Sequence, residues 1–176
     1  GLSTHISDMD LSSTGVLQIF CGYYSWSGTK GYRYTANPAT VTPTTWATPV
    51  SMPAALSNAT NIALASAGDV FYALPANSSN ETPYVVKSID GGQNWTQTNT
   101  TALASGTVGL SSGQGWFCIA LAVDPANPDN AVIGGLNAFK TSDGGATWTR
   151  VSQWYGVGPI SYVHADHHYA LWNGNR

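Results

Sequence analysis

Short apolar runs recur along the chain and are separated by clusters of Gly, Pro, Asn and Asp. Runs of this kind, rich in β-branched and aromatic residues, indicate strands. The alanines of residues 51–60 come nearest to a helical pattern, but Pro53 and Asn58 beside them favour a loop. The chain is therefore predicted to be all-β. The strand candidates are residues 15–24, 61–65, 69–74, 84–88, 117–123, 130–136 and 162–172.

One short segment occurs twice: SIDGGQNWT at residues 88–96 and TSDGGATWT at residues 141–149. Two strand candidates precede each copy, and a third leads directly into it. The repeating unit is therefore four strands long, with the segment between the third and fourth strands. The matching positions are Ser88 with Thr141, Asp90 with Asp143, Gly92 with Gly145, and Trp95 with Trp148.

The ends of the chain fit the same unit less closely. Residues 5–9, 16–22 and 31–35 supply three strands, and Thr45-Trp46 stands where the repeated segment would be, without its acidic turn. Tyr162–Asp166 is predicted to be the first strand of a fourth unit. The predicted blades are residues 1–55, 56–112, 113–160 and an incomplete 161–176 within one domain, which is expected to be a piece of a longer protein or to be completed by other chains. A compact sandwich is the alternative.

The repeated segment has the residues that a tight turn requires. Its glycines accept positive φ angles, and its Asp carboxylate can accept hydrogen bonds from backbone N–H groups. The Ser or Thr two positions earlier adds a hydroxyl, and the Trp covers the turn with an apolar face. The segment is therefore interpreted as a clasp that holds a hairpin. A metal or ligand role for Asp90 or Asp143 is the less favoured reading.

Composition narrows the classes of partner. Only 9% of residues are charged, the formal net charge is −3, and the six Lys and Arg residues are scattered, which argues against nucleic-acid binding. No apolar run is long enough to span a membrane. Abundant Thr, Ser and Asn favour a secreted or cell-surface protein. Cys21 and Cys118 are expected to be buried, unpaired and a whole blade apart.

The repeated S/T-x-D-G-G-x-x-W-T pattern resembles the Asp-box, or BNR, repeat of sialidases, sortilin-type receptors and xyloglucanase-like glycosidases. Residues 113–148, followed by the segment YVHADHH, resemble secreted bacterial members of this group. The resemblance implies a β-propeller of four-stranded blades, about three of them in this chain plus the start of a fourth. It also implies that the box lies on an outer turn, away from the functional face.

Catalytic groups are scarce in this chain. A sialidase needs three arginines and a Tyr–Glu pair, but the chain has only Arg33, Arg150 and Arg176, and Glu81 is its only glutamate. A general glycosidase needs two carboxylates across the scissile bond. Most of the acidic residues lie in predicted turns. Asp8 and Asp166 are the candidate pair, because both lie on predicted first strands that would border the propeller channel.

The segment VHADHH raises a metal hypothesis. On an extended strand, His164, Asp166 and His168 share one face, and two imidazoles with a carboxylate match a metal-ligand set in type. All three would come from a single strand, however, so hydrogen bonding to a neighbouring blade is favoured. No cofactor is expected.

Aromatic residues near strand ends complete the candidate sites. Trp116, Trp154 and Tyr155 are proposed ligand-binding residues, together with the histidine segment, because aromatic faces stack on sugar rings; packing between blades is the alternative. Tyr23, Tyr24, Trp26 and Trp172 belong to the same set. The predicted function is a binding or adhesion module for a glycan or a protein. The alternative is a glycoside hydrolase whose catalytic groups lie partly outside this chain.

Overall fold

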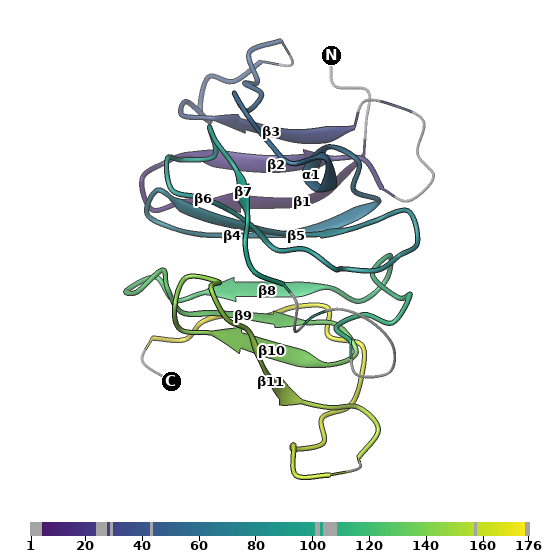
Figure 1. The fold of residues 1–176 in the computed structure, drawn as a ribbon. Helices are drawn as coiled ribbons and strands as arrows, with labels where there is room; N and C mark the ends of the chain where they lie inside the picture. The colour runs from purple at the N-terminus through teal and green to yellow at the C-terminus, as the bar shows by residue number, and fades with distance from the viewer. Residues whose placement is uncertain are drawn as a thin grey trace.

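The computed structural model describes residues 5–23, 28, 30–42, 44–100, 103, 109–156 and 158–174. Tyr24, Trp26 and Arg176 lie outside these residues. The described chain forms three antiparallel sheets and one short helix, which confirms the all-β prediction (Figure 1). Each sheet falls within one of the three complete blades that the sequence predicts. No helix in the described residues is long and apolar enough to cross a membrane.

The first sheet has three strands in the order β1-β2-β3: β1 Ile6–Leu11, β2 Leu17–Cys21 and β3 Gly31–Thr35. Glycine at positive φ occurs at the ends of its strands, at Gly15 between β1 and β2 and at Gly31, the first residue of β3. A single bridge between Tyr34 and Ala47 stands where a fourth strand would be. This is the place where the sequence lacks the acidic turn.

The other two sheets have four strands each, joined in chain order. The second contains β4 Asn61–Ala67, β5 Val70–Ala76, β6 Val86–Ser88 and β7 Thr96–Gln97. The third contains β8 Ala120–Val123, β9 Ala131–Gly134, β10 Ala138–Thr141 and β11 Thr149–Ser152. Both repeated segments lie between the third and fourth strands of their sheets, as predicted.

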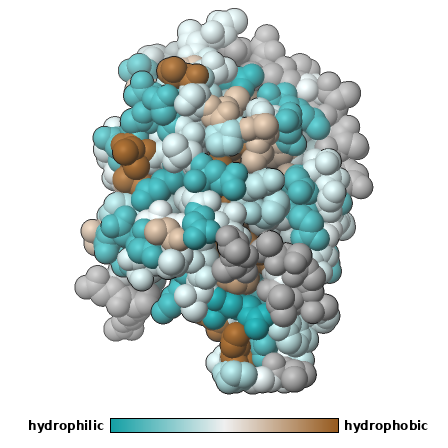
Figure 2. All heavy atoms as spheres, viewed as in Figure 1, coloured by the Kyte–Doolittle hydropathy of each residue, from teal (hydrophilic) through white to brown (hydrophobic). Residues whose placement is uncertain are grey.

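The sheets stack face to face, with their first strands β1, β4 and β8 side by side (Figure 1). One apolar core fills the space between the first and second sheets, with Phe20, Tyr32 and Phe71 fully buried. A second core lies between the second and third sheets around Tyr72 and Phe139. The side of the molecule seen in Figure 2 is mostly hydrophilic, with a few small hydrophobic patches. Burial on both faces explains why β5, β8 and residues 62–65 of β4 are continuous apolar runs rather than alternating ones.

Two predictions about local structure are wrong. Residues 51–60 contain a helical turn, α1 Ala54–Ser57, whose Leu56 is buried in the first core. Tyr162–Asp166 is not a strand. Tyr162 makes one parallel bridge to Gln153, beyond β11, and Asp166 has a φ of 72°, which interrupts an extended conformation.

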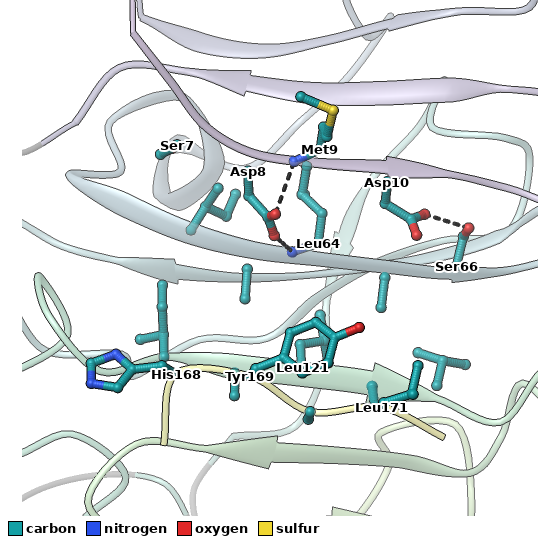
Figure 3. Close-up of a pocket in the computed structure, with 18 of the residues that line it drawn as sticks. Ser7, Asp8, Met9, Asp10, Leu64, Ser66, Leu121, His168, Tyr169 and Leu171 are labelled. Atoms are coloured by element: carbon teal, nitrogen blue, oxygen red, sulfur yellow. Dashed lines mark hydrogen bonds between the residues drawn. The ribbon is translucent and has the colours of Figure 1, made fainter. Parts of the chain in front are cut away.

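A few residues after Asp166, the chain comes to lie next to β8, the first strand of the third sheet. The backbone N–H of His167 donates to the carbonyl of Gly135 over 3.0 Å, and this bond brings the chain across the third sheet. Residues 168–171 then run alongside β8 in the same direction as that strand (Figure 3). Residues 168–171, and not Tyr162–Asp166, are therefore the part of this segment that lies beside a first strand, although they do not form a strand themselves.

Candidate binding face

The two ends of the sheets differ in character. We call the end that carries the turns at residues 88–96 and 141–149 the box face. We call the opposite end the loop face; it is formed by Tyr23, Asn61, residues 111–118, residues 135–137 and Trp154. The pairing of Ala120 with Gly134, Ala138 with Gly134 and Ala138 with Ser152 places the start of β8 and the end of β11 together on the loop face.

On the box face, each Asp carboxylate organises its own turn. Asp90 Oδ1 accepts the Ser88 hydroxyl at 2.7 Å and the backbone N–H groups of Gln93 and Asn94 at 3.1 and 2.9 Å. Partial burial raises the pKa of Asp90, but hydrogen bonds, chiefly from Asn94, outweigh it and leave the pKa below its usual value. The Trp95 indole N–H closes the turn on the Gly92 carbonyl at 2.9 Å.

The second turn repeats this arrangement. Asp143 Oδ1 accepts the Thr141 hydroxyl at 2.7 Å and the Thr147 backbone N–H at 2.9 Å, while Oδ2 accepts the Thr147 hydroxyl at 2.6 Å. The bonds from Thr147, followed by that from Thr141, lower the pKa of Asp143 to about 2. Both carboxylates are occupied by their own turns.

A cavity of about 500 Å³ runs along the first strands (Figure 3). Its walls are residues 7–10 of β1, 61–66 of β4, 119–123 of β8 and the segment 168–172, and Phe117 lies at its loop-face end. These elements would border the central channel of a propeller. The cavity is therefore where the candidate carboxylates have to be tested.

Asp8 lines this cavity, but β4 already engages its carboxylate. Oδ2 of Asp8 accepts the Leu64 N–H at 2.7 Å, and Oδ1 accepts the Met9 N–H at 2.9 Å. Burial raises the pKa of Asp8 more than these bonds lower it, and the nearby Asp10 raises it further. Asp10, the other carboxylate of β1, accepts hydrogen bonds from the Ser66 hydroxyl and the Gln18 side-chain amide. Both carboxylates thus join β1 to its surroundings, chiefly β4.

Asp166 does not join Asp8. It is exposed, is not part of the cavity wall, and lies beside Cys118, whose pKa is raised to about 11 by burial and by this carboxylate. Of the proposed catalytic pair, the structure therefore places only Asp8 in the channel. Asp10 was detectable in the sequence, since it follows Asp8 at the two-residue spacing that puts side chains on one face of a strand.

The histidines of residues 164–168 are also dispersed. His164 Nδ1 lies 3.0 Å from the carbonyl of Ala165, and the His168 ring packs edge-on against Phe117. His167 Nδ1 lies 2.7 Å from the Gly135 carbonyl. The expected common face of His164, Asp166 and His168 is wrong, because the chain turns at Asp166. Among the residues described, no three His, Cys, Asp or Glu side chains are arranged to hold a metal ion.

The loop face carries a connected series of aromatic side chains. The Tyr23 hydroxyl donates to the Trp116 carbonyl at 3.2 Å, and the Trp116 and Phe117 ring centroids are 5.3 Å apart. The Phe117 and His168 centroids are 4.5 Å apart. We call Tyr23, Trp116, Phe117 and His168 the aromatic row. It extends from the end of the first sheet to His168, and its members Phe117 and His168 also line the cavity.

The aromatic row is exposed but anchored. Tyr23, Trp116 and Phe117 retain 43%, 41% and 46% of their accessible surface, so packing between blades does not account for them. The Asn61 amide donates to the carbonyls of Gly115 and Trp116 at 3.1 and 3.2 Å and holds the Trp116 loop on β4. The sequence analysis identified Trp116 and missed Phe117, although Phe117 precedes a buried run as an additional exposed aromatic.

Trp154 and Tyr155 form a separate pair beyond β11. Their ring centroids are 6.1 Å apart, and Arg150 donates to the Tyr155 hydroxyl at 2.7 Å. The backbone N–H of Trp154 donates to the Asn137 side-chain carbonyl at 3.2 Å, and this bond fixes the pair to the loop face. The proposed ligand-binding aromatics therefore share one face but form two groups, at its inner and outer parts.

Comparison with known proteins establishes the fold. No family model matches the chain. Over 64 residues the chain is 39% identical to xyloglucanase Xgh74A of Acetivibrio thermocellus; the match covers 32% of this chain and 8% of that protein.

Solved structures give broader matches. A GH74 enzyme of Niastella koreensis superposes with a TM-score of 0.60 and 19% identity over 96% of this chain and 24% of its own. YCF48 bound to D1 peptide superposes with a TM-score of 0.56 and 17% identity over 86% of this chain and 41% of its own. At these identities the likeness shows the fold alone: the chain has a β-propeller fold.

Proposed function

We propose that this chain is part of a secreted or cell-surface β-propeller that binds a glycan on its loop face. The observation that carries the proposal is the exposed aromatic row, whose Trp116 loop is held by Asn61 and whose Phe117 and His168 also line the cavity. Aromatic side chains offer a large apolar face at low conformational cost, and binding sites combine such faces with a few placed polar groups. The low charge of the chain suits a neutral, hydroxyl-rich ligand better than an ionic one.

The repeated turns support the same orientation. The Asp90 and Asp143 carboxylates and their glycines are committed to the box face, at the opposite end of the sheets. The loop face, in contrast, carries exposed rings on elements that the sheets hold in place. Ligand contacts are therefore expected on the loop face, and the box face is expected to be structural.

A glycoside hydrolase is the second candidate, and the partial match to a xyloglucanase favours it. The carboxylates of this chain do not support it alone, because Asp8 is bonded to β4 and Asp166 lies outside the cavity wall. Hydrolysis would require catalytic groups from outside these residues. A protein ligand is the third possibility that the experiment below includes, because the solved YCF48 complex contains a peptide.

Calorimetric titration with xyloglucan oligosaccharides, cello-oligosaccharides and an unrelated extended peptide tests the proposal. We expect an oligosaccharide to bind and Trp116→Ala to weaken it by about tenfold, or about 1.4 kcal/mol. Trp154→Ala, at the outer pair, serves as the matched control and should change affinity less. Binding of the peptide alone, or an unchanged affinity in Trp116→Ala, would contradict the proposal. Release of reducing ends by the protein would favour the enzyme.

A further inference from the structure

Both repeated turns contact the blade that precedes them, as well as closing their own hairpins. In the first turn, the Gln93 carbonyl accepts the Val50 N–H at 2.8 Å, and the Trp95 N–H donates to the Ser51 carbonyl at 3.0 Å. Residues 50 and 51 follow the first sheet. In the second turn, the Gly145 carbonyl accepts the Asn99 N–H at 3.2 Å, and Asn99 follows the second sheet.

A lysine reinforces the contact between the second and third blades. Lys87, on β6, donates to the Gly144 carbonyl at 3.3 Å and lies 3.5 Å from the Asp129 carboxylate. Its ammonium group also lies 5.1 Å from the centre of the Tyr72 ring. The Lys87 side chain is only 17% exposed, so this contact is largely shielded from solvent. The Lys87 ammonium group thus donates a hydrogen bond to a glycine carbonyl in the turn of the next blade.

The turn glycines are fitted to this contact. A Cβ at Gly144 would lie 2.6 Å from Lys87 Nζ, and one at Gly145 would lie 2.8 Å from Thr98 Cγ2. At the corresponding position of the first turn, a Cβ on Gly92 would collide with the Tyr32 hydroxyl of the preceding blade. Each turn therefore packs against the preceding blade, in addition to closing its own hairpin.

The third blade has a lysine, Lys140, at the position that is equivalent to Lys87. Lys140 precedes Asp143 at the same spacing as Lys87 precedes Asp90, and the register agrees, since Lys87 faces Thr96 and Lys140 faces Thr149. Lys140 is exposed, and so is Val151 on the neighbouring strand. Towards the channel, residues 168–171 lie beside β8 and line the cavity with it, as β8 lies beside β4 (Figure 3). The established interface between blades therefore continues onto this face.

We propose that the outer part of the third blade, centred on Lys140, is a receptor for a further Asp-box turn, whose first glycine carbonyl Lys140 would bind. The occupant is the turn of a blade whose first strand would contain residues 168–172. The two turns of the present chain are already held by the first and second blades. In a repeat architecture each unit contacts its neighbours in the same manner, and this is the physical basis of the inference.

The test appends the remainder of a blade after Trp172, taken either from residues 123–155 or from residues 66–100, so that each extension supplies one such turn. Acylation of lysines by a soluble active ester, read by mass spectrometry, reports their accessibility. In the 176-residue chain, Lys140 should react several times faster than Lys87. In a folded extension, Lys140 should become as slow as Lys87, and Lys140→Met should lower its melting temperature but leave that of the unextended chain unchanged.

Three results would overturn the proposal. Lys140 could stay reactive in an extension whose circular dichroism shows added sheet. Both extensions could fail to add protected amides in hydrogen exchange, although a complementary receptor should order a blade that carries the turn. Light scattering could show that the unextended chain self-associates through Lys140, which would make a second copy the occupant. Extensions in which the turn Asp is replaced by Ala provide the matched control.

Discussion

Replacing Gly92 by Ala separates two costs that are usually confounded, the strain of a positive φ and the loss of space between blades. Gly92 has a φ of 87°, and Gly15, between β1 and β2, has a φ of 86°. A Cβ at Gly15 would meet no atom within 4 Å, whereas a Cβ at Gly92 would collide with the Tyr32 hydroxyl and lie 3.2 Å from the Phe71 ring. The two positions are therefore matched in backbone strain and differ in packing.

The expected magnitudes follow from this comparison. A left-handed conformation costs an alanine roughly 1–2 kcal/mol, and this term applies to both variants. Overpacking a rigid interior adds about 1–3 kcal/mol, and only Gly92→Ala carries this term because Tyr32 and Phe71 are fully buried. Gly92→Ala should therefore lower the free energy of unfolding by roughly 2–5 kcal/mol, against roughly 1–2 kcal/mol for Gly15→Ala.

Urea unfolding followed by tryptophan fluorescence measures both values, and Tyr32→Phe identifies the colliding atom. The Tyr32 hydroxyl is buried and has no hydrogen-bond partner in the described part of the chain, so its removal alone should be nearly neutral. In the Gly92→Ala background, Tyr32→Phe should restore about 0.5–3 kcal/mol, because the two residues are in contact. Equal losses for Gly92→Ala and Gly15→Ala, or additive effects of Tyr32→Phe, would show that the turn is not packed between blades.

Two further predictions concern the turn carboxylates. Asp90→Ala should lower the free energy of unfolding by about 1–3 kcal/mol, since two backbone N–H groups and one hydroxyl lose their acceptor; unchanged melting combined with lost ligand binding would instead assign Asp90 to the binding site. The pKa of Asp143 is about 2 in the folded chain and roughly 3.9 when unfolded, so its stabilisation is complete above about pH 4 and disappears as the pH falls to about 2. Thermal melts between pH 5 and 2 should show this loss, and Asp143→Asn should flatten it, whereas Asp8, whose folded pKa is raised, should act in the opposite direction.

The fold could be predicted from the sequence wherever local interactions between neighbouring residues determine the structure. Two Gly residues at positive φ and an Asp that accepts backbone N–H groups are local requirements, so the turns at Asp90 and Asp143 could be located directly. The strands β4, β5 and β8 could also be predicted, because burial on both faces makes them continuous apolar runs, apart from Asn61 and Ser66 in β4. The single turn of α1 was missed, because it is fixed by the burial of Leu56 in the core between blades and not by its own helical propensity.

The candidate site was less accessible, because its members come together only across blades. Trp116 could be selected as an aromatic residue in a loop, but its neighbours Tyr23 and His168 lie 93 and 52 positions away in the sequence. Nothing local to Tyr23 indicates that its hydroxyl reaches the Trp116 carbonyl. Likewise, the position of Asp8 on a predicted first strand suggested a catalytic carboxylate, while the Leu64 N–H that donates to this carboxylate belongs to another blade.

The strand predicted at Tyr162–Asp166 fails for a local reason. Asp166 adopts a φ of 72°, and an extended strand cannot contain that conformation. The first strands β4 and β8 share the sequence Ile-Ala-Leu-Ala, at residues 62–65 and 119–122, and residues 169–172 are Tyr-Ala-Leu-Trp. Aligning the shared Ala-Leu pair predicts that residues 169–172 lie next to β8, and residues 168–172 do line the cavity together with that strand. The same alignment carries His168 to the loop-face end of the cavity, where its ring contacts Phe117.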